Sequence, residues 1–493
     1  MLLALLFLVS LPAVTARLYS ADEVQYFSYL RSLYFDGDVS FENEYRYFYE
    51  RNIAQSPGYH ETFLERETRV GRRVNYATIG AGILWLPFYA AADVWARATG
   101  TVEANGLTQP YIAGVAYGSA FYGFLAVLLS ARGAALILGR RRHPGGPLES
   151  DGEAIPFAPV AGPALVVWVG TPLLFYMYVA PPFSHACSAF AVALFVNVWL
   201  HVRRRWTAGG AFALGLSAAL VAMVREQDAF VALGPLVDFG VASFRSRRST
   251  SRVRTPQPPA LDVQKGTGMA GAALAGLLGT LLGYAPQLLA YNAINGYPGP
   301  AEHVSRKMYW LSPWALNVLF SPHHGFFFWT PLAVLAFAGL YLLKDRMVAS
   351  SLGIMAVSQV YVAGSVMSWT VAGAFGQRRF VCLTVVLIIG LASLWNAVAP
   401  PRRALARAAP PDGARRLAAP GYAIVALVLL CAWWNVALMA QFATRLMDRQ
   451  RLEPARNAYH AFVTLPLSLP SLGWRYLTDR GSFYDQRGID ERR

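Results

Sequence analysis

The sequence predicts an all-α integral membrane protein with about eleven transmembrane helices, because apolar runs of membrane-crossing length alternate with basic clusters along the chain. Hydrophobic residues make up 55% and charged residues 14% of the chain, whereas roughly a quarter of residues are charged in ordinary soluble domains. A helix that crosses about 30 Å of hydrocarbon needs about 20 mostly apolar residues. Runs close to that length occupy residues 1–17, 110–139, 160–180, 183–201, 208–224, 229–243, 269–292, 325–343, 347–368, 379–398 and 420–440.

The basic clusters indicate how these helices are oriented, because Lys and Arg concentrate on the cytoplasmic side of membrane proteins. Successive clusters are separated by two apolar runs, which places the N-terminus inside and residues 18–109 outside. The net charge of +15 is divided among these clusters and does not form one groove, so we expect no nucleic-acid partner. The clusters are Arg140–Arg142, Arg203–Arg205, Arg245–Arg254 with Lys265, Lys344 with Arg346, and Arg402–Arg416.

The same alternation divides the chain into two parts. Residues 1–443 are expected to form the membrane domain, including the outer loop 18–109, and residues 444–493 a polar extracytoplasmic tail. The alternation also favours a retained first helix over a cleaved signal peptide. The apolar segment Tyr76–Trp95 would break the alternation if it crossed, so we expect an interfacial or re-entrant helix there. These features predict a multi-pass protein of the inner or plasma membrane whose outer loop faces the periplasm or the exterior.

The outer loop begins with a short segment of helical periodicity. Tyr26, Leu30 and Leu33 fall on one helical face, which predicts an amphipathic helix lying on the membrane. Asp22 and Glu23 would then stand at the start of this helix, close to the bilayer surface.

Asp22 and Glu23 are the candidate catalytic residues. A carboxylate at the membrane surface can take a proton from an acceptor hydroxyl, or bind a metal ion that bridges to a phosphate. Ser20 and Glu23 also have the spacing of a capping box, which offers a purely structural role for Glu23. Asp22 is therefore the better candidate for chemistry.

Further along the outer loop, Asp36-Gly37-Asp38 is followed by Glu42 and Glu44. These carboxylates suit a cation site, but Asp-Gly is also an ordinary turn signal and the spacing differs from an EF-hand. Asp38 and Glu44 are candidate contacts to a substrate. A divalent metal is compatible with the sequence but not required by it, so the cofactor stays unassigned.

Polar residues also occur at the predicted outer ends of the crossing helices, where one cavity can gather them. Charged groups at membrane depth are costly and usually face a cavity. A guanidinium binds phosphate oxygens in a bidentate manner, so Arg225, Arg378 and Arg379 are candidate phosphate ligands, and His185 is a further candidate substrate contact. The structural alternatives are an ion pair between Arg225 and its acidic neighbours, and a hydrogen-bonded structural role for His185.

This layout resembles the GT-C superfamily of integral membrane glycosyltransferases, which use polyprenyl-phosphate-linked sugars. The first helix is followed at once by a large outer loop that opens with Asp22-Glu23-Val-Gln-Tyr26. Protein O-mannosyltransferases have a similar acidic pair, and related bacterial enzymes of the aminoarabinose-transferase type place an Asp in the same loop. Two further segments look like those of uncharacterised bacterial proteins grouped with these enzymes: Leu319-Phe-Ser-Pro-His-His-Gly-Phe-Phe-Phe-Trp-Thr-Pro331 and Ser368-Trp-Thr-Val-Ala-Gly-Ala-Phe-Gly-Gln-Arg-Arg-Phe380.

The resemblance implies an inverting-type transfer of a sugar from a polyprenyl-phosphate donor to an extracytoplasmic glycan, lipid or protein. It implies that Asp22 acts as the general base with help from Glu23, and that Arg378 or Arg379, with Arg225, holds the donor phosphate. Many members carry a second acid on the next outer loop, whereas that loop here reads Ala-Pro-Pro-Phe-Ser-His-Ala. Either His185 replaces the second acid or that acid lies elsewhere.

Two other classes stay open on the sequence alone. A transporter or flippase for a lipid-linked or anionic solute would also have many crossing helices, and so would a structural or assembly subunit. Transporters tend to place ionisable groups in the middle of discontinuous helices, whereas the charges of this chain gather at the predicted helix ends. This distribution favours the enzyme.

Overall fold

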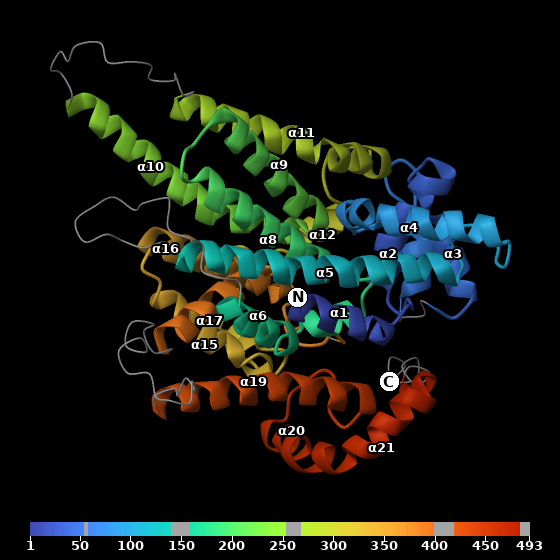
Figure 1. Ribbon diagram of the computed structural model, residues 1–493. Coiled ribbons are helices and arrows are strands. Elements are labelled where there is room, and N and C mark those ends of the chain that lie inside the picture. Colours follow the sequence, from blue (N-terminus) through green and yellow to red (C-terminus); the bar gives the residue numbers. More distant parts are fainter. Residues whose placement is uncertain (54–57, 140–157, 253–267, 372, 399–418, 484–493) are drawn as a thin grey trace.

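A computed structural model of the protein shows a bundle of helices (Figure 1). Within the described part of the chain the extended pairings are two isolated β-bridges, Glu67 with Arg73 and Met308 with Val366, so the expected all-α class is confirmed there. The basic clusters Arg140–Arg142 and Arg402–Arg416, together with Lys265, lie outside the described residues. The structure describes residues 1–53, 58–139, 158–252, 268–371, 373–398 and 419–483.

Seven helical segments in the described ranges are long and apolar enough to cross a membrane, which supports the prediction of a multi-pass membrane protein. They comprise α5 (Gln109–Leu138), α8 (His185–Val202), η4 (Glu226–Ala232) with α10 (Leu233–Arg252), α11 (Met269–Asn295), α16 (Arg346–Ser365), η5 (Arg378–Leu383) with α17 (Thr384–Val398), and α19 (Ala419–Thr444). Shorter apolar helices are α1 (Leu2–Ser10) with η1 (Leu11–Ala13), α6 (Ala158–Val169), α9 (Ala208–Val224) and α15 (Leu332–Tyr341). Each apolar run of the sequence contains one of these helices, and the number of crossings stays a prediction.

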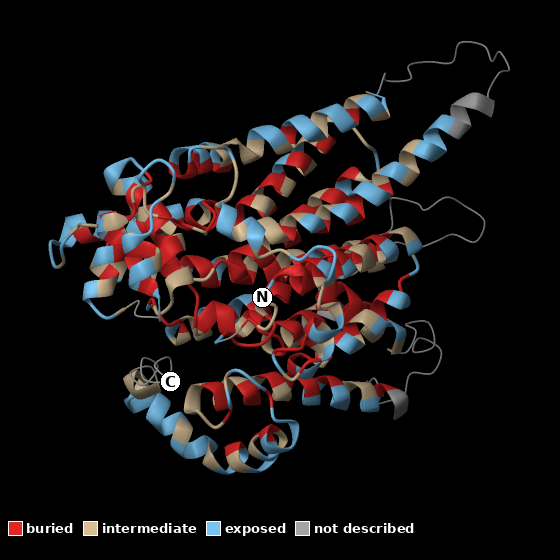
Figure 2. Ribbon diagram, turned by 180° about the vertical axis from the view of Figure 1, so that it is seen from behind, coloured by how far each residue is buried: buried red, intermediate tan, exposed pale blue. Residues whose placement is uncertain are grey.

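The predicted outer loop, residues 18–109, contains a group of helices, and we call these residues the outer segment. This segment lies at one end of the bundle (Figure 1). The long helices run side by side across the view, and α2, α3 and α4 gather at their right-hand ends. Buried residues concentrate in the middle of the bundle, whereas α10, α11 and α21 expose more of their surface (Figure 2). The outer segment contains α2 (Ala21–Arg31), η2 (Ser32–Asp36), α3 (Glu42–Glu50), η3 (His60–Glu65) and α4 (Gly80–Thr99).

Helix α8 connects two groups of charged residues at opposite ends of the bundle. Its 18 residues correspond to a rise of about 27 Å. His185 is its first residue, and Arg203 follows its last. The Arg203 guanidinium donates to Asp238 at 2.8 Å and to Asp345 at 2.8 Å. The basic cluster that begins at Arg203 is therefore a full helix length away from His185.

Two of the predicted crossings are interrupted by short breaks. The run 160–180 divides into α6 and α7 (Leu173–Tyr178), and the run 325–343 into α14 (Phe326–Trp329) and α15. A break in a helix leaves backbone carbonyls without their helical hydrogen bonds. In an apolar surrounding these carbonyls need another partner. Asn435 on α19 donates its side-chain amide to Val169 O at 2.9 Å and to Thr171 O at 3.1 Å. A side chain of a neighbouring helix thus donates to the carbonyls that the break between α6 and α7 leaves without helical partners.

The prediction that α2 is an amphipathic helix on the membrane surface is wrong. Seven of its 11 residues are buried, including Val24, Phe27 and Tyr29, which are 0% exposed. Leu33, which was expected on the apolar face, is 40% exposed. Aromatic residues of α3 and α4 cover α2, since the Phe27 ring packs edge-on against Phe48 and Tyr89. Helix α2 is thus part of a small aromatic core of the outer segment.

Helix α4 packs in the antiparallel sense along the first half of α5. The Asp93 carboxylate accepts from the Tyr111 hydroxyl at 2.7 Å, and the Trp85 indole donates to Ser119 at 2.8 Å. This helix is not among the seven segments of the described ranges that have crossing length and apolarity, and its interfacial or re-entrant position stays a prediction. Its axis runs beside α5 (Figure 1), which suits a re-entrant helix better than one that lies flat at the interface.

The last described residues form helices rather than the polar tail that the sequence suggested. They comprise α20 (Pro454–Tyr459), η6 (His460–Thr464), α21 (Leu465–Thr478) and η7 (Arg480–Phe483). Helix α21 exposes apolar side chains, with Leu467 81% and Trp474 70% exposed. The Arg480 guanidinium donates to Pro12 O at 2.6 Å and to the Thr15 hydroxyl at 3.1 Å. This contact holds the C-terminal helices against the end of the N-terminal helix.

Close packing between α9 and α11 depends on glycine. A Cβ atom on Gly215 would lie 2.1 Å from Gly276 O, and one on Gly279 would lie 2.3 Å from Phe212 O. Small residues let apolar helices approach closely, which gains packing in a membrane where the hydrophobic effect between helices is weak. Helix α9 ends at Val224, directly before Arg225, so this contact fixes the helix that carries the arginine.

We predict that Gly215→Ala lowers the apparent melting temperature of the protein in detergent, with a loss of about 1 to 3 kcal/mol from overpacking. Gly209→Ala in the same helix is the matched control, since a Cβ there meets nothing within 4 Å. Thermal unfolding of the two variants, followed by tryptophan fluorescence, measures the difference. Equal melting temperatures would contradict the proposed helix contact.

Candidate functional site

A cavity of about 150 Å³ lies where the outer segment meets one end of the bundle. Its walls come from α2, from the strand-like stretch before α4, and from the ends of bundle helices that are far apart in sequence. Five of the predicted site residues meet here: Asp22, His185, Arg225, Arg378 and Arg379. The other lining residues are Gln25, Tyr26, Tyr76, Ala77, Phe183 and Gln227.

Asp22 faces the cavity from the first turn of α2. Its carboxylate accepts from the Arg378 guanidinium at 3.0 Å, and its side chain is 47% exposed, so the second face of the carboxylate is open. Arg378 begins η5, and its guanidinium also lies over the Phe183 ring, 5.1 Å from the ring centre. The pair joins the outer segment to the bundle across 356 residues of sequence.

Arg225 lies between a histidine and a buried carboxylate. One of its guanidinium nitrogens contacts His185 Nδ1, and because arginine is only a donor, that ring nitrogen acts as the acceptor. On its other side, Arg225 Nε lies 3.3 Å from Asp228 Oδ2, and the Asp228 side chain is 1% exposed. The predicted ion pair of Arg225 thus exists, and the same guanidinium still lines the cavity. Asp228 is the second acid of this cluster.

Arg379 is held by oxygen atoms of the backbone instead of a carboxylate. Its guanidinium donates to Ser368 O at 3.0 Å, to Trp369 O at 3.4 Å and to the Ser368 hydroxyl at 3.3 Å. The residue is 9% exposed. Carbonyl dipoles orient a guanidinium without cancelling its charge, so Arg379 retains a full positive charge at the cavity wall.

The charges around the cavity do not balance. Three guanidiniums line the cavity together with one carboxylate, Asp22, while Asp228 pairs with Arg225 from outside the lining. A net charge in a poorly solvated site is costly unless a counter-ion binds. Guanidiniums match the geometry of phosphate and carboxylate groups. The positive lining of the cavity is thus complementary to an anion.

The stretch before α4 is attached to both α2 and the bundle. The Tyr76 amide donates to Gln25 Oε1 at 2.8 Å, and the Thr78 hydroxyl donates to Val224 O at 2.9 Å. The Ile79 amide donates to Gln287 Oε1 at 2.9 Å. These bonds place Tyr76 and Ala77 in the cavity wall, which is the part of the predicted 76–95 segment that reaches the site.

Glu23 serves the local structure of α2. One of its carboxylate oxygens accepts from the Ser20 amide at 2.9 Å and from the Tyr19 amide at 2.6 Å, while the Ser20 hydroxyl accepts from the Glu23 amide. The predicted capping box is therefore present. Glu23 is 0% exposed and does not line the cavity, so its contribution is to fix the direction in which Asp22 points.

Asp38 and Glu44 lie away from the cavity. Asp38 Oδ1 accepts from the Ser32 hydroxyl at 2.8 Å and from the Ser40 amide at 2.9 Å, which is the turn that the Asp-Gly signal predicted. Glu44 pairs with Arg31 at 3.0 Å, and its side chain is 0% exposed. Both carboxylates are thus engaged inside the outer segment and neither lines this cavity, so their contact with a substrate stays a prediction.

The described residues contain no group of three or more His, Cys, Asp or Glu side chains arranged to hold a metal ion. Asp36 and Glu44 share the guanidinium of Arg31, and Glu42 pairs with Arg46. Asp36, Glu42 and Glu44 of the suggested cation site therefore have basic partners, and Asp38 accepts from Ser32 and Ser40.

Six lining residues escaped the sequence analysis as site residues: Gln25, Tyr26, Tyr76, Ala77, Phe183 and Gln227. Tyr26 follows Asp22 by one helical turn, so the spacing already indicated a shared face, but the residue was assigned to a membrane-facing surface. Burial raises the pKa of Tyr26, so its hydroxyl stays protonated at neutral pH. Gln25, Tyr76 and Gln227 carry no signal of their own, because their positions depend on contacts between distant segments.

No protein-family model matches this sequence, and no curated protein sequence matches it. Among solved structures, the chain is similar to ArnT from Cupriavidus metallidurans, crystallised with bound undecaprenyl phosphate. The two chains are 14% identical, the alignment covers 97% of this chain and 77% of that one, and the TM-score is 0.46. The function is therefore inferred from the residues of the cavity.

We predict that inorganic phosphate raises the melting temperature of the protein by binding this cavity. The rise should be larger in Asp22→Asn, because the Asp22 carboxylate competes with phosphate for Arg378, and it should disappear in Arg378→Gln. The measurement is thermal unfolding in detergent across a phosphate titration at constant ionic strength, with Glu61→Gln as the exposed control. The same phosphate response in all four proteins would show that the anion binds elsewhere.

We also predict a pH dependence of stability that comes from Glu44. Burial raises the pKa of Glu44 to about 7 from its ordinary 4.5, and the Arg31 guanidinium, which also pairs with Asp36, offsets this rise only in part. The group then binds its proton more tightly in the folded state, so its stabilising contribution is complete below pH 4.5 and is lost as the pH rises through 7. The loss amounts to at most about 3 kcal/mol.

Glu44→Gln imitates the protonated carboxyl. The melting temperature of this variant should therefore fall less than that of the wild type between pH 5 and pH 8, because the contribution of Glu44 to the fall is removed. Glu61→Gln, which changes an exposed carboxylate of the same outer segment, should keep the wild-type profile. Parallel profiles for wild type and Glu44→Gln would refute the role of Glu44.

Proposed function

We propose that this protein transfers a sugar from a polyprenyl-phosphate-linked donor to a hydroxyl group of an extracytoplasmic acceptor, with inversion at the sugar carbon. One observation carries the proposal. Three guanidiniums and a half-exposed carboxylate line one cavity at the end of a bundle of membrane-length helices. This combination can hold a phosphate and accept a proton within the same small volume.

The excess charge of the cavity fits the donor. A polyprenyl phosphosugar is a phosphodiester and carries a single negative charge, which the positively charged arginine cluster can compensate. Its two ester oxygens lead to the lipid and to the sugar. Arg225, Arg378 and Arg379 approach from different elements, so they can contact different oxygens of one phosphate.

The location of the cavity fits a lipid-linked substrate. His185, Arg225 and Arg378 lie at the ends of α8, α9 and η5, where apolar helical surface meets the outer segment. The headgroup of a lipid lies at this level when its chain is in the bilayer. A soluble nucleotide sugar would have no need of that arrangement.

The chemistry requires one bond to form and one to break. The acceptor oxygen attacks the anomeric carbon of the sugar, the bond from that carbon to the phosphate oxygen breaks, and the lipid phosphate leaves. The proton of the acceptor hydroxyl passes to the Asp22 carboxylate. Guanidiniums around the leaving phosphate stabilise the negative charge that it gains in the transition state.

The contact between Asp22 and Arg378 links donor binding to the availability of the Asp22 carboxylate. Without donor, the carboxylate is paired with the guanidinium at 3.0 Å. A phosphate that binds Arg378 competes for this guanidinium, and the partly released carboxylate can accept the proton of the acceptor hydroxyl. Glu23 supports this step by holding the start of α2, and His185 supports it by keeping Arg225 in the cavity wall.

We predict that Asp22→Asn lowers donor turnover by about 10² to 10⁴-fold while it preserves phosphate binding, because the variant loses a general base but keeps the arginines. Arg378→Gln should instead weaken binding of undecaprenyl phosphate by about tenfold or more. The assay uses purified protein with radiolabelled undecaprenyl-phosphate hexoses and pentoses, and cell-envelope extract as the acceptor source.

Glu61→Gln, an exposed change outside the cavity, is the activity control. Wild-type turnover in Asp22→Asn would remove Asp22 from the role of the base. A flippase is the competing function, and it predicts lipid movement across liposome membranes without formation of a new glycosidic bond. Flux of intact donor that is unaffected by Asp22→Asn would favour that alternative.

A further inference from the structure

A second pocket adjoins the arginine cavity on the outer side. It has a volume of about 440 Å³ and lies between the stretch 66–76 of the outer segment and the stretch 295–306 that includes α12 (Glu302–Arg306). Tyr76 lines both this pocket and the arginine cavity. A neighbouring pocket shares Arg69 and Tyr297 with it, so the hollow continues toward the surface. The two sites are therefore neighbours, separated by one tyrosine.

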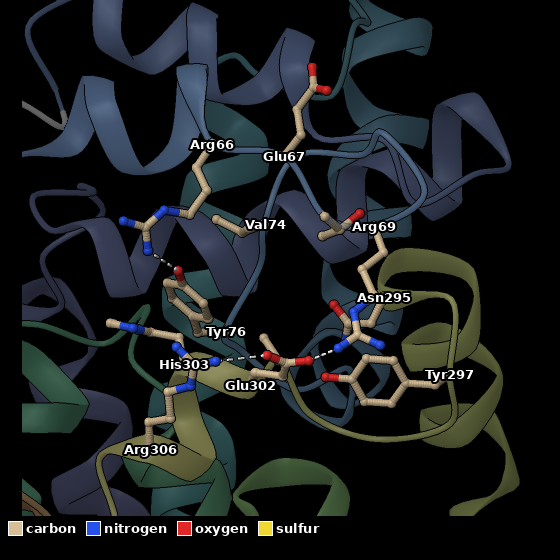
Figure 3. Close-up of a pocket in the computed structure, with 12 residues that line it drawn as sticks. Arg66, Glu67, Arg69, Val74, Tyr76, Asn295, Tyr297, Glu302, His303 and Arg306 are labelled. Carbon is tan, nitrogen blue, oxygen red and sulfur yellow. Dashed lines mark hydrogen bonds and ion pairs between the residues drawn. The ribbon is translucent and has the colours of Figure 1, made fainter.

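Basic side chains dominate the charge of this pocket (Figure 3). Glu302 accepts from Arg306 at 3.2 Å and also pairs with Arg69, so one carboxylate is shared by two guanidiniums. Glu67 also lines the pocket and lies 3.4 Å from Arg73. These pairs leave the pocket with more guanidinium than carboxylate charge.

Arg66 is the cation with the greatest freedom to meet a ligand. Its guanidinium donates to the Tyr76 hydroxyl at 3.4 Å, and within the described part of the chain no ion pair joins it to a carboxylate. Figure 3 shows its guanidinium directed toward Tyr76, at the wall shared with the arginine cavity. A ligand bound to Arg66 would thus lie next to the proposed reaction centre.

The remaining lining groups suit a sugar. Tyr76 and His303 lie against one another with ring centres 5.4 Å apart, and Arg69 lies over the Tyr297 ring at 5.6 Å. Aromatic rings offer flat apolar surfaces, and the carboxylate of Glu302 offers acceptor atoms for hydroxyl groups. Rings combined with hydrogen-bonding side chains match a molecule that has both C–H faces and hydroxyl groups.

We infer that this pocket binds the acceptor, and that the acceptor is a saccharide bearing an acidic group. The acidic group meets Arg66 and the guanidiniums beside Glu302, and a hydroxyl of the sugar points past Tyr76 toward Asp22. This inference rests on the proposed function, because it assigns the second substrate of the same reaction. It also assigns a use to His303 and Arg306 of α12, which line the pocket.

The test measures binding of trigalacturonic acid and of neutral maltotriose to the full-length protein in detergent, at low ionic strength. We expect the acidic trisaccharide to bind about tenfold more tightly than the neutral one. Arg66→Gln should remove most of that preference and leave the affinity for undecaprenyl phosphate unchanged. Arg46→Gln is the matched control, since Arg46 is a 55% exposed arginine of the same outer segment that lies outside the pocket.

The result would be overturned if the acidic and neutral trisaccharides bound equally, or if Arg66→Gln and Arg46→Gln behaved alike. A failure of the proposed function gives a different result, namely an affinity for undecaprenyl phosphate that Arg378→Gln does not change. A third arm uses Arg306→Gln, which removes a guanidinium beside Glu302 and should weaken binding of the acidic trisaccharide. Wild-type binding in that variant as well as in Arg66→Gln would place the acidic ligand elsewhere.

Discussion

Three arginines lie around one small cavity at the end of an apolar helix bundle, and the surrounding structure is arranged to compensate their charges. Arg378 pairs with Asp22, Arg225 with Asp228, and Arg379 is held by backbone carbonyls. Each form of compensation has a different consequence. The buried Asp228 makes Arg225 a permanent part of the wall, whereas the half-exposed Asp22 can exchange its partner for a bound anion. The cluster is thus held in place while one positive charge stays available.

The same constraint explains why the outer segment and the bundle form one site. Asp22 belongs to α2, whereas its partner Arg378 begins η5. The wall between them depends on the hydrogen bond that Gln25 accepts from Tyr76 and the one that Thr78 donates to Val224. The Gly215 contact between α9 and α11 supports the end of α9 from behind. A change in any of these contacts moves an arginine relative to Asp22. The pocket beyond Tyr76, which we propose for the acceptor, adjoins the arginine cavity and extends this arrangement.

The sequence patterns of α2 and of the acidic residues Asp38 and Glu44 were ambiguous for the same physical reason. The periodicity of Tyr26, Leu30 and Leu33 suggested a helix on the membrane surface, yet aromatic residues from α3 and α4 enclose α2 on several sides. Periodicity reports which residues share a face, but it cannot distinguish lipid from protein as the apolar partner. Asp38 and Glu44 were equally ambiguous, because a carboxylate has the same sequence signature whether it holds a turn, an arginine or a substrate.

The sequence by itself determined the all-helical class, the positions of the apolar runs, the capping box at Ser20 and the polar residues at helix ends. These features are local, since they depend on composition, period and spacing within about one helix length. Only the tertiary structure decided that Asp22, with Arg225, Arg378 and Arg379, lines one cavity, and that Glu44 does not. Convergence of residues separated by more than 350 positions depends on helix packing, and no local pattern encodes it. The exact partner of Asp22, on which the proposed chemistry depends, is therefore a property of the packed bundle.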